Sequence, residues 1–148
     1  MLAYLATSPL GSVAINDFRR QQFVLCGSTL KLTDLDDLSI EEPECQRNQD
    51  CSQEELLKDL KLNRSYMGNE VVGCVNRACI GYNEKQNVIN LYRHFVSLFL
   101  PINVPDVVRQ DVKLLLSAYL TSNWSSKIVL KQAELLYKKI NDINLKNY

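Results

Sequence analysis

The sequence has few of the residues that interrupt helices. Among its 148 residues there are five glycines and four prolines, while 46% of the residues are hydrophobic. Turn-rich β folds use glycine and proline more freely, because tight turns depend on them. The shortage favours helices over a β sandwich. A length of 148 residues suits a single domain.

Long uninterrupted apolar runs are also missing. The most apolar stretch, residues 86–100, contains Arg93 and His94 near its middle and is followed by Pro101. A membrane-spanning helix needs about 20 apolar residues, so neither a transmembrane span nor a membrane partner is expected. The opening residues also lack the basic stretch of a secretory signal, because the first basic residue is Arg19.

An odd number of cysteines, five, cannot pair completely within one chain. Without a secretory signal we expect reduced thiols and an intracellular location, cytoplasmic or nuclear. Cys45, Cys51, Cys74 and Cys79 are weak candidates for zinc ligands, because their spacings are wider than those of common zinc knuckles. Free thiols are the preferred interpretation, and a Cys45–Cys51 disulfide is an alternative. We expect no cofactor.

Hydrophobic periodicity predicts three helices in the second half. The stretch 86–100 has an apolar face typical of a central core helix. A second amphipathic helix is expected at 105–121 and a third at 124–143. Short connections favour antiparallel neighbours, so residues 86–143 are expected to form a three-helix bundle. The helical faces that support this are Val88, Leu91, Tyr92, Phe95 and Phe99 in the first helix, Val108, Val112, Leu115, Leu116 and Tyr119 in the second, and Ile128, Gln132, Leu135, Leu136, Ile140 and Ile143 in the third.

The first half is less regular. Residues 1–33 suggest an arm followed by a short hairpin around Cys26-Gly27-Ser28, and residues 34–51 read as an acidic loop. A capping box at Ser52 predicts a helix over 52–63. Residues 67–82 fit a helix, with a hairpin turning at Asn76-Arg77 as the alternative.

The predicted fold is therefore mainly α. We expect one domain, 1–148, with a helical bundle of about five helices and a short N-terminal extended or hairpin segment. The helical body would occupy 52–148.

Charge is distributed unevenly although the net charge is zero. Residues 34–59 hold ten carboxylates against two basic residues, whereas residues 85–148 hold nine Lys or Arg against four acids. The acidic segment is either a solvated loop or a docking segment for a partner protein. Its candidate partner-binding residues are Asp36, Asp37, Glu41 and Glu42. The run Asp34-x-Asp36-Asp37 lacks the glycine and the glutamate of a calcium-binding loop.

Other candidate binding residues lie in the basic C-terminal region. Lys127, Lys131 and Lys138 suggest a stripe that nucleic acid could contact, although such domains are usually far more basic. Trp124 is a candidate for protein binding, because tryptophan is enriched at interface hot spots. His94, the lone histidine, is read as a surface or core-edge residue rather than half of a Cys–His catalytic pair.

These observations favour a non-enzymatic subunit or adaptor of a larger assembly, such as a viral one, or a homo-oligomer. Protein–protein interaction would use the N-terminal arm, the acidic loop and the helical surface. The alternative is a small nucleic-acid-associated module that uses the basic C-terminal helices.

Overall fold

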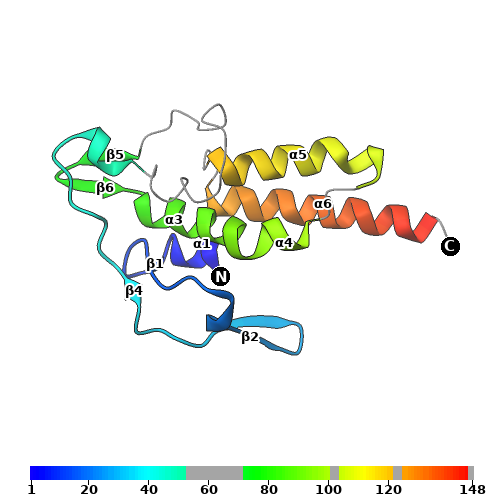
Figure 1. Cartoon of the computed structure of the whole chain (residues 1–148), viewed down its shortest axis with the longest axis horizontal. Coiled ribbons are helices and arrows are strands. Elements are labelled where there is room, and N and C mark those ends of the chain that lie inside the picture. Colours follow the sequence, from blue (N-terminus) through cyan, green and yellow to red (C-terminus); the bar gives the residue numbers. More distant parts are fainter. Residues whose placement is uncertain (53–71, 101–103, 122–124, 147–148) are drawn as a thin grey trace.

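The computed structural model describes residues 1–52, 72–100, 104–121 and 125–146 (Figure 1). Helices make up most of the second half of the chain, and one short helix lies at the N-terminus. They are α1 (Leu2–Leu5), α3 (Tyr82–Leu91), a π-helical stretch (Tyr92–Val96) that continues into α4 (Ser97–Phe99), α5 (Asp106–Thr121) and α6 (Ser126–Lys146).

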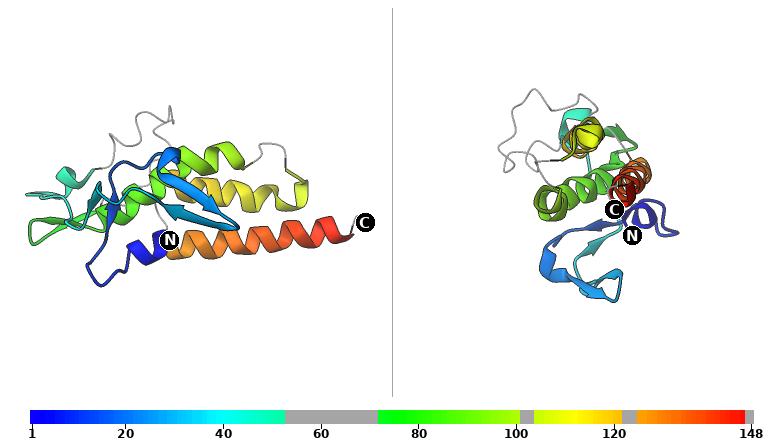
Figure 2. Two further views of the ribbon diagram at one scale, coloured as in Figure 1. Left: turned by 90° about the horizontal axis from the view of Figure 1, so that it is seen from below. Right: turned by 90° about the vertical axis from the view of Figure 1, so that its right-hand side faces the viewer.

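The main hydrophobic core lies between α3, α5 and α6. Figure 2 looks along these helices in its right-hand view and shows them packed beside one another, with the N-terminal strands on one side. Apolar residues recur every three or four positions on α5, which places them on one face of the helix. The buried residues of this core are Val88, Val104, Val108, Val112, Leu115, Tyr119, Val129 and Leu136.

Three small antiparallel pairings make up the β structure of the described residues. β1 (Ala14–Ile15) pairs with β4 (Leu38–Ser39), and β2 (Phe23–Cys26) pairs with β3 (Thr29–Leu32). β5 (Gly73–Val75) pairs with β6 (Ala78–Ile80). Short 3₁₀ turns precede β2, at Arg20–Gln22, and follow the acidic residues, at Asn48–Cys51.

The expected five-helix bundle is wrong. The chain is a small mixed α/β domain with several two-stranded sheets and two disulfides. Residues 34–51 were expected to form an acidic loop, but they include β4 and a 3₁₀ turn. Such short elements bury too few residues to produce a readable hydrophobic period.

The largest local error concerns residues 67–82, for which a helix was preferred. The described part of this stretch is the β5–β6 hairpin, in which Cys74 lies opposite Cys79. Its turn residues Asn76 and Arg77 have φ angles of 51° and 66°, the left-handed conformation that two-residue hairpin turns require. The hairpin alternative was therefore correct.

Several expected elements are confirmed. The hairpin after residue 22 is present as β2–β3, and α5 matches the helix expected at 105–121. On α6, however, Ile128 and Leu135 are exposed although they were expected to face inward. The helix predicted at 52–63 lies outside the described residues except for Ser52. Trp124 also lies outside them. None of the described helices combines the length and apolarity needed to cross a membrane.

Candidate active site

Two β pairings bring the loop 16–22, which follows β1, beside the segment 33–37, which follows β3. At one end the Thr33 N–H donates to the Gln22 carbonyl at 2.9 Å. At the other end the Asn16 N–H donates to a carbonyl of the facing segment, also at 2.9 Å. Because both ends are hydrogen-bonded, side chains from the two segments can meet in a fixed arrangement.

Three polar side chains converge between these segments. The Nε2 atom of Gln22 donates to Oδ2 of Asp17 at 2.8 Å and to Oδ2 of Asp34 at 3.2 Å. The other oxygen of Asp34, Oδ1, accepts from the Asp36 N–H at 3.2 Å. The Gln22 amide therefore bridges two carboxylates that would otherwise repel each other.

Asp17 is held in its ionised form by its neighbours. Its side chain is 24% exposed and pairs with the guanidinium of Arg19. Hydrogen bonds from Arg19 and then from Gln22 hold the pKa of the Asp17 carboxyl below its ordinary value. At neutral pH the group is therefore a carboxylate that can accept a proton.

Phe18 anchors the loop that carries Asp17. It is 3% exposed, and its ring centroid lies 5.1 Å from that of Phe23, 6.1 Å from that of His94 and 6.2 Å from that of Phe95. His94 and Phe95 both belong to the π-helical stretch. The residue next to Asp17 is thus packed on the π-helical stretch between α3 and α4, which limits how far Asp17 can move.

Buried asparagines of α3 hold β1 from the other side. The Ile15 N–H donates to Oδ1 of Asn87 at 3.0 Å, and Nδ2 of Asn87 donates to the Val13 carbonyl at 2.8 Å. Asn83 donates to the carbonyls of Ser12 and Glu41. One helix therefore fixes both the strand that leads into Asp17 and the acidic segment that follows Asp34.

The converging groups suit a hard cation. Carboxylate and amide oxygens are the ligands that Mg²⁺ accepts in proteins. Asp34 and Gln22 offer one of each, joined by a hydrogen bond, and Asp17 lies beside them. This donor set fits magnesium better than zinc, which prefers sulfur and nitrogen.

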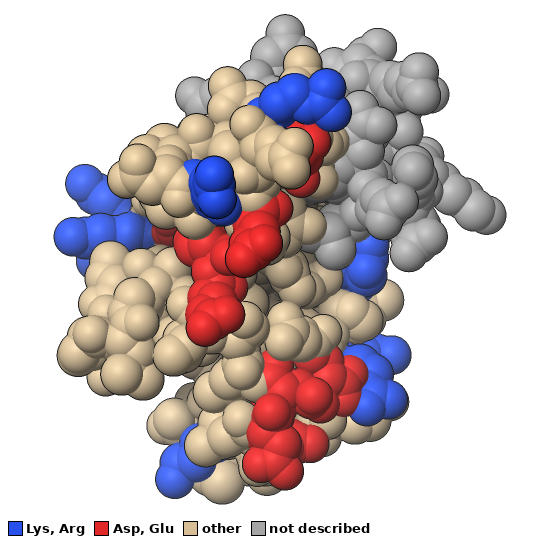
Figure 3. All heavy atoms as spheres, turned by 90° about the vertical axis from the view of Figure 1, so that its left-hand side faces the viewer, with Lys and Arg blue, Asp and Glu red and all other residues tan. Residues whose placement is uncertain are grey.

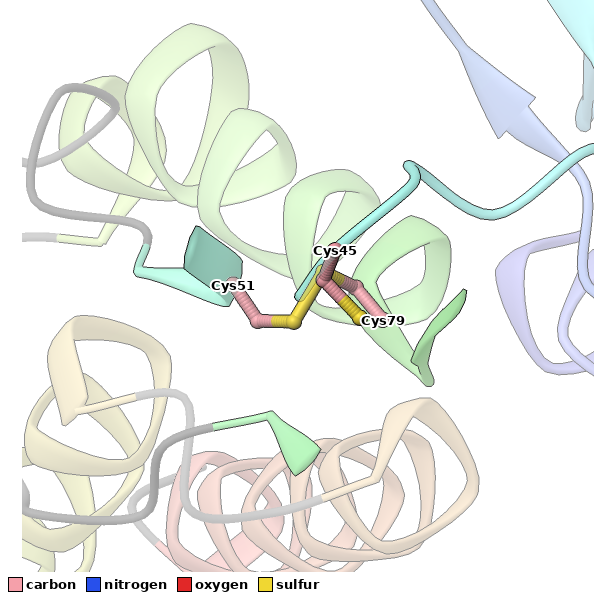
Figure 4. A group of neighbouring side chains, drawn as sticks. All are labelled: Cys45, Cys51 and Cys79. Atoms are coloured by element: carbon pink, nitrogen blue, oxygen red, sulfur yellow. A yellow bond between two sulfur atoms is a disulfide. The ribbon is translucent and has the colours of Figure 1, made fainter. Parts of the chain in front are cut away.

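The four candidate zinc ligands are joined in two disulfides, Cys45–Cys74 and Cys51–Cys79. In Figure 4 the side chains of Cys45, Cys51 and Cys79 crowd together, which reflects two disulfides packed side by side. Oxidised sulfur offers no thiolate to a metal. The Cys45–Cys51 pairing considered from the sequence does not form either, and Cys26 is the exposed free cysteine.

The acidic candidates for partner binding differ in their exposure and in their hydrogen bonds. Asp36, Asp37 and Glu41 are exposed. Glu42 instead accepts hydrogen bonds from the N–H groups of Gly81 and Asn83, at 2.9 and 3.0 Å, at the start of α3. Figure 3 views the end of the molecule that carries the disulfides and shows acidic side chains gathered across it. Whether a partner contacts this face remains a prediction.

The basic candidates Lys127, Lys131 and Lys138 lie exposed along α6. Lys139 pairs with Asp111 of α5 at 2.6 Å, so part of the positive charge in this region is neutralised within the chain. Nucleic-acid binding remains a prediction.

The sequence resembles a known kinase. It is 38% identical over 134 residues to the protein named extracellular tyrosine-protein kinase PKDCC from Homo sapiens, covering 90% of this chain. The chain spans about a quarter (25%) of that relative's length. No protein-family model matches the chain, and no solved structure matches it either.

This finding and the disulfides correct the expected location, and the relative's name bears on the expected absence of enzymatic activity. The intracellular location is wrong, because two disulfides and a relative named as extracellular point to an oxidising, extracellular setting. The relative is also named as a kinase, which is at odds with the expectation that the chain is no enzyme.

Asp17 and Gln22 were not among the residues expected to be functional, and Asp34 was considered only as part of the acidic segment. A signal was present: an acid followed five positions later by an amide, then a hairpin, then another acid. The hairpin was identified, but its role in bringing its two flanks together was not considered.

Proposed function

We propose that this chain carries the catalytic loop and the metal-binding acid of a protein kinase that phosphorylates tyrosine outside the cell. The observation that carries the proposal is the convergence of Asp17, Gln22 and Asp34. Protein kinases place a catalytic acid and a metal-binding amide in an H-R-D-x-x-x-x-N loop, and the metal-binding acid in D-F-G. Asp17 and Gln22 have the same spacing as that acid and amide, and Asp34 follows them after a hairpin.

The match to these motifs is partial. Ile15-Asn16 stand where kinases have His-Arg, and glutamine replaces asparagine at position 22. Asp34-Leu35-Asp36 stands where kinases have Asp-Phe-Gly. Support therefore comes from the acids, their spacing and their convergence, together with the printed name of the relative.

Each residue would have a distinct role. The Asp17 carboxylate accepts the proton of the attacking tyrosine hydroxyl, and its ionisation is favoured by Arg19 and Gln22. Asp34 and Gln22 would hold magnesium through their oxygen atoms. When bound, the metal neutralises charge on the nucleotide phosphates. Gln22 also keeps the two carboxylates at a fixed separation, so that Asp17 is oriented before substrate arrives.

The test is phosphoryl transfer by the native protein that contains these residues. These 148 residues hold no G-x-G-x-x-G motif of the kind that covers ATP phosphates in kinases, so this stretch should not be assayed alone. The native protein would be incubated with labelled ATP, magnesium and a tyrosine-containing peptide polymer. We expect label on tyrosine.

The decisive variant is Asp17→Asn, which keeps the shape of the side chain but removes the base. A lost general base costs about 10²- to 10⁴-fold in rate. The matched control is Asp142→Asn, at an exposed position of α6, which should leave the rate unchanged. Equal rates in the wild type and Asp17→Asn, or no transfer by the wild type, would refute the proposal.

A further inference from the structure

The continuous helix formed by α3, the π-helical stretch and α4 changes its hydrogen-bonding pattern where it packs against the candidate catalytic loop, residues 16–22. It is α-helical from Tyr82 to Leu91, π-helical from Tyr92 to Val96 and α-helical again in α4. Short π-helical insertions occur frequently at functional sites, because the extra residue re-aims the side chains around it. Here the insertion contains His94 and Phe95, two of the three residues whose rings lie against Phe18.

Those two rings contact Phe18 differently. The His94 ring lies nearly parallel to the Phe18 ring, at 24° and 6.1 Å between centroids. The Phe95 ring meets Phe18 edge-on, at 77° and 6.2 Å. Phe18 directly follows Asp17 in the chain, so the packing of its ring limits how far the backbone at Asp17 can move.

We propose that His94 is a positioning residue for Asp17: its neutral ring packs against Phe18 and holds the catalytic loop, and its protonation disturbs that loop, so that phosphoryl transfer falls as the surroundings become acidic. This inference rests on the proposed function for its catalytic consequence. Its structural part, the loosening of residues 16–22 by acid, does not depend on that function.

The charges around His94 explain why acid, rather than base, should disturb the loop. Among the described residues, Arg93 of the same helix, Arg20 of the turn before β2 and Asp17 of the loop act on the imidazole. Partial burial and then the two guanidinium groups lower the pKa of His94, and Asp17 opposes them. A protonated ring would add a third cation beside Arg93 and Arg20.

Protonation would act on the loop in two ways. The new charge repels Arg20, which lies three positions after Asp17 in the same loop. It also attracts the Asp17 carboxylate and so competes with Arg19 and Gln22 for it. Because the folded arrangement favours the neutral ring, its stabilising contribution is present above the unfolded pKa of histidine and is lost as pH falls through the lowered folded value.

The experiment compares the native protein with its His94→Phe variant, which keeps an aromatic ring but cannot titrate. Hydrogen–deuterium exchange of the peptide covering residues 16–22 would be measured at pH 7.5 and 5.5, after correction for the intrinsic effect of pH on exchange. We expect the wild type to lose protection at pH 5.5, by at most about tenfold, because that pH lies about one unit below the ordinary pKa of histidine. The variant should show the same protection at both pH values. A wild type whose protection is unchanged, or a variant that responds like the wild type, would overturn the inference.

A second measurement follows the ratio of phosphoryl-transfer rates at pH 7.5 and 5.5 within each protein. The ratio should be larger in the wild type than in His94→Phe, and equal ratios would overturn the catalytic part of the inference. Absence of transfer by the wild type at both pH values would refute the proposed function and with it the catalytic part, while the exchange data would still decide whether His94 positions the loop.

Discussion

In the described part of the chain, the hairpins β2–β3 and β5–β6 are attached to the rest of the fold by different interactions. β5–β6 is joined to the preceding segment by two disulfides, and Cys79 within it is fully buried. β2–β3 exposes Val24, Leu25 and Leu30 and is held through hydrogen bonds and aromatic packing at its open end. An isolated hairpin is marginal in water, so each needs support. The covalent support lies away from the candidate site, and the non-covalent support is built into it.

The largest effect should come from breaking the covalent attachment. Replacing Cys51 and Cys79 together by alanine should lower the free energy of unfolding by about 2–5 kcal/mol, the usual cost of losing a native disulfide. Both side chains are almost completely buried, so lost packing adds to the effect. Urea unfolding of the purified protein measures the change.

The same measurement on Cys45→Ala with Cys74→Ala sharpens the comparison. Cys74 is half-buried, so we expect a smaller loss than for the first pair. Cys26→Ser, at the exposed free cysteine, is the control and should have little effect. A loss at Cys26 as large as that at Cys51 and Cys79 would show that the disulfide assignment is wrong.

A comparable effect is expected where α3 holds the strand that leads into the candidate site. Asn87→Ala removes the donor and the acceptor that serve Val13 and Ile15, and it leaves two buried backbone groups without these partners. Each buried group left unsatisfied costs about 1–3 kcal/mol. With two such groups, the unfolding free energy should fall by about 2–6 kcal/mol, and amide exchange near Ile15 should quicken. Gln110→Ala, at an exposed position of α5, is the control; equal losses in both variants would contradict a specific role for Asn87.

The helical part of the fold was predictable because its information is local. Val108, Val112 and Leu115 repeat with a helical period, and all three are buried as expected. The apolar stripe at 67–82 has a similar period, yet Cys74 and Cys79 lie opposite each other across a hairpin. Periodicity does not account for the disulfides at those two residues, which join them to partners 29 and 28 positions away.

The candidate site was less predictable because its contacts are distant in sequence. Ile15 and Asn87 are 72 residues apart, and their hydrogen bond is what fixes the strand that leads to Asp17. Gln22 looked like an ordinary polar residue before a strand, and the β2–β3 and β1–β4 pairings together bring the flanks of the hairpin beside each other. The π-helical change at Tyr92–Val96 has no sequence signal that we identified.

The smallest effect should come from Glu42, which lies between the two attachments. Its carboxylate accepts from the N–H groups of Gly81 and Asn83 where α3 begins, and an anion there also interacts favourably with the helix dipole. Glu42→Gln keeps one acceptor but loses the charge, so we expect a loss of about 0.5–1 kcal/mol in urea unfolding. Glu41→Gln is the matched control, since its side chain is exposed. If both variants lost the same stability, the effect would reflect the general acidity of the segment rather than the capping of α3. The acidic residues would then be a solvated surface and would not connect the disulfides to the candidate site.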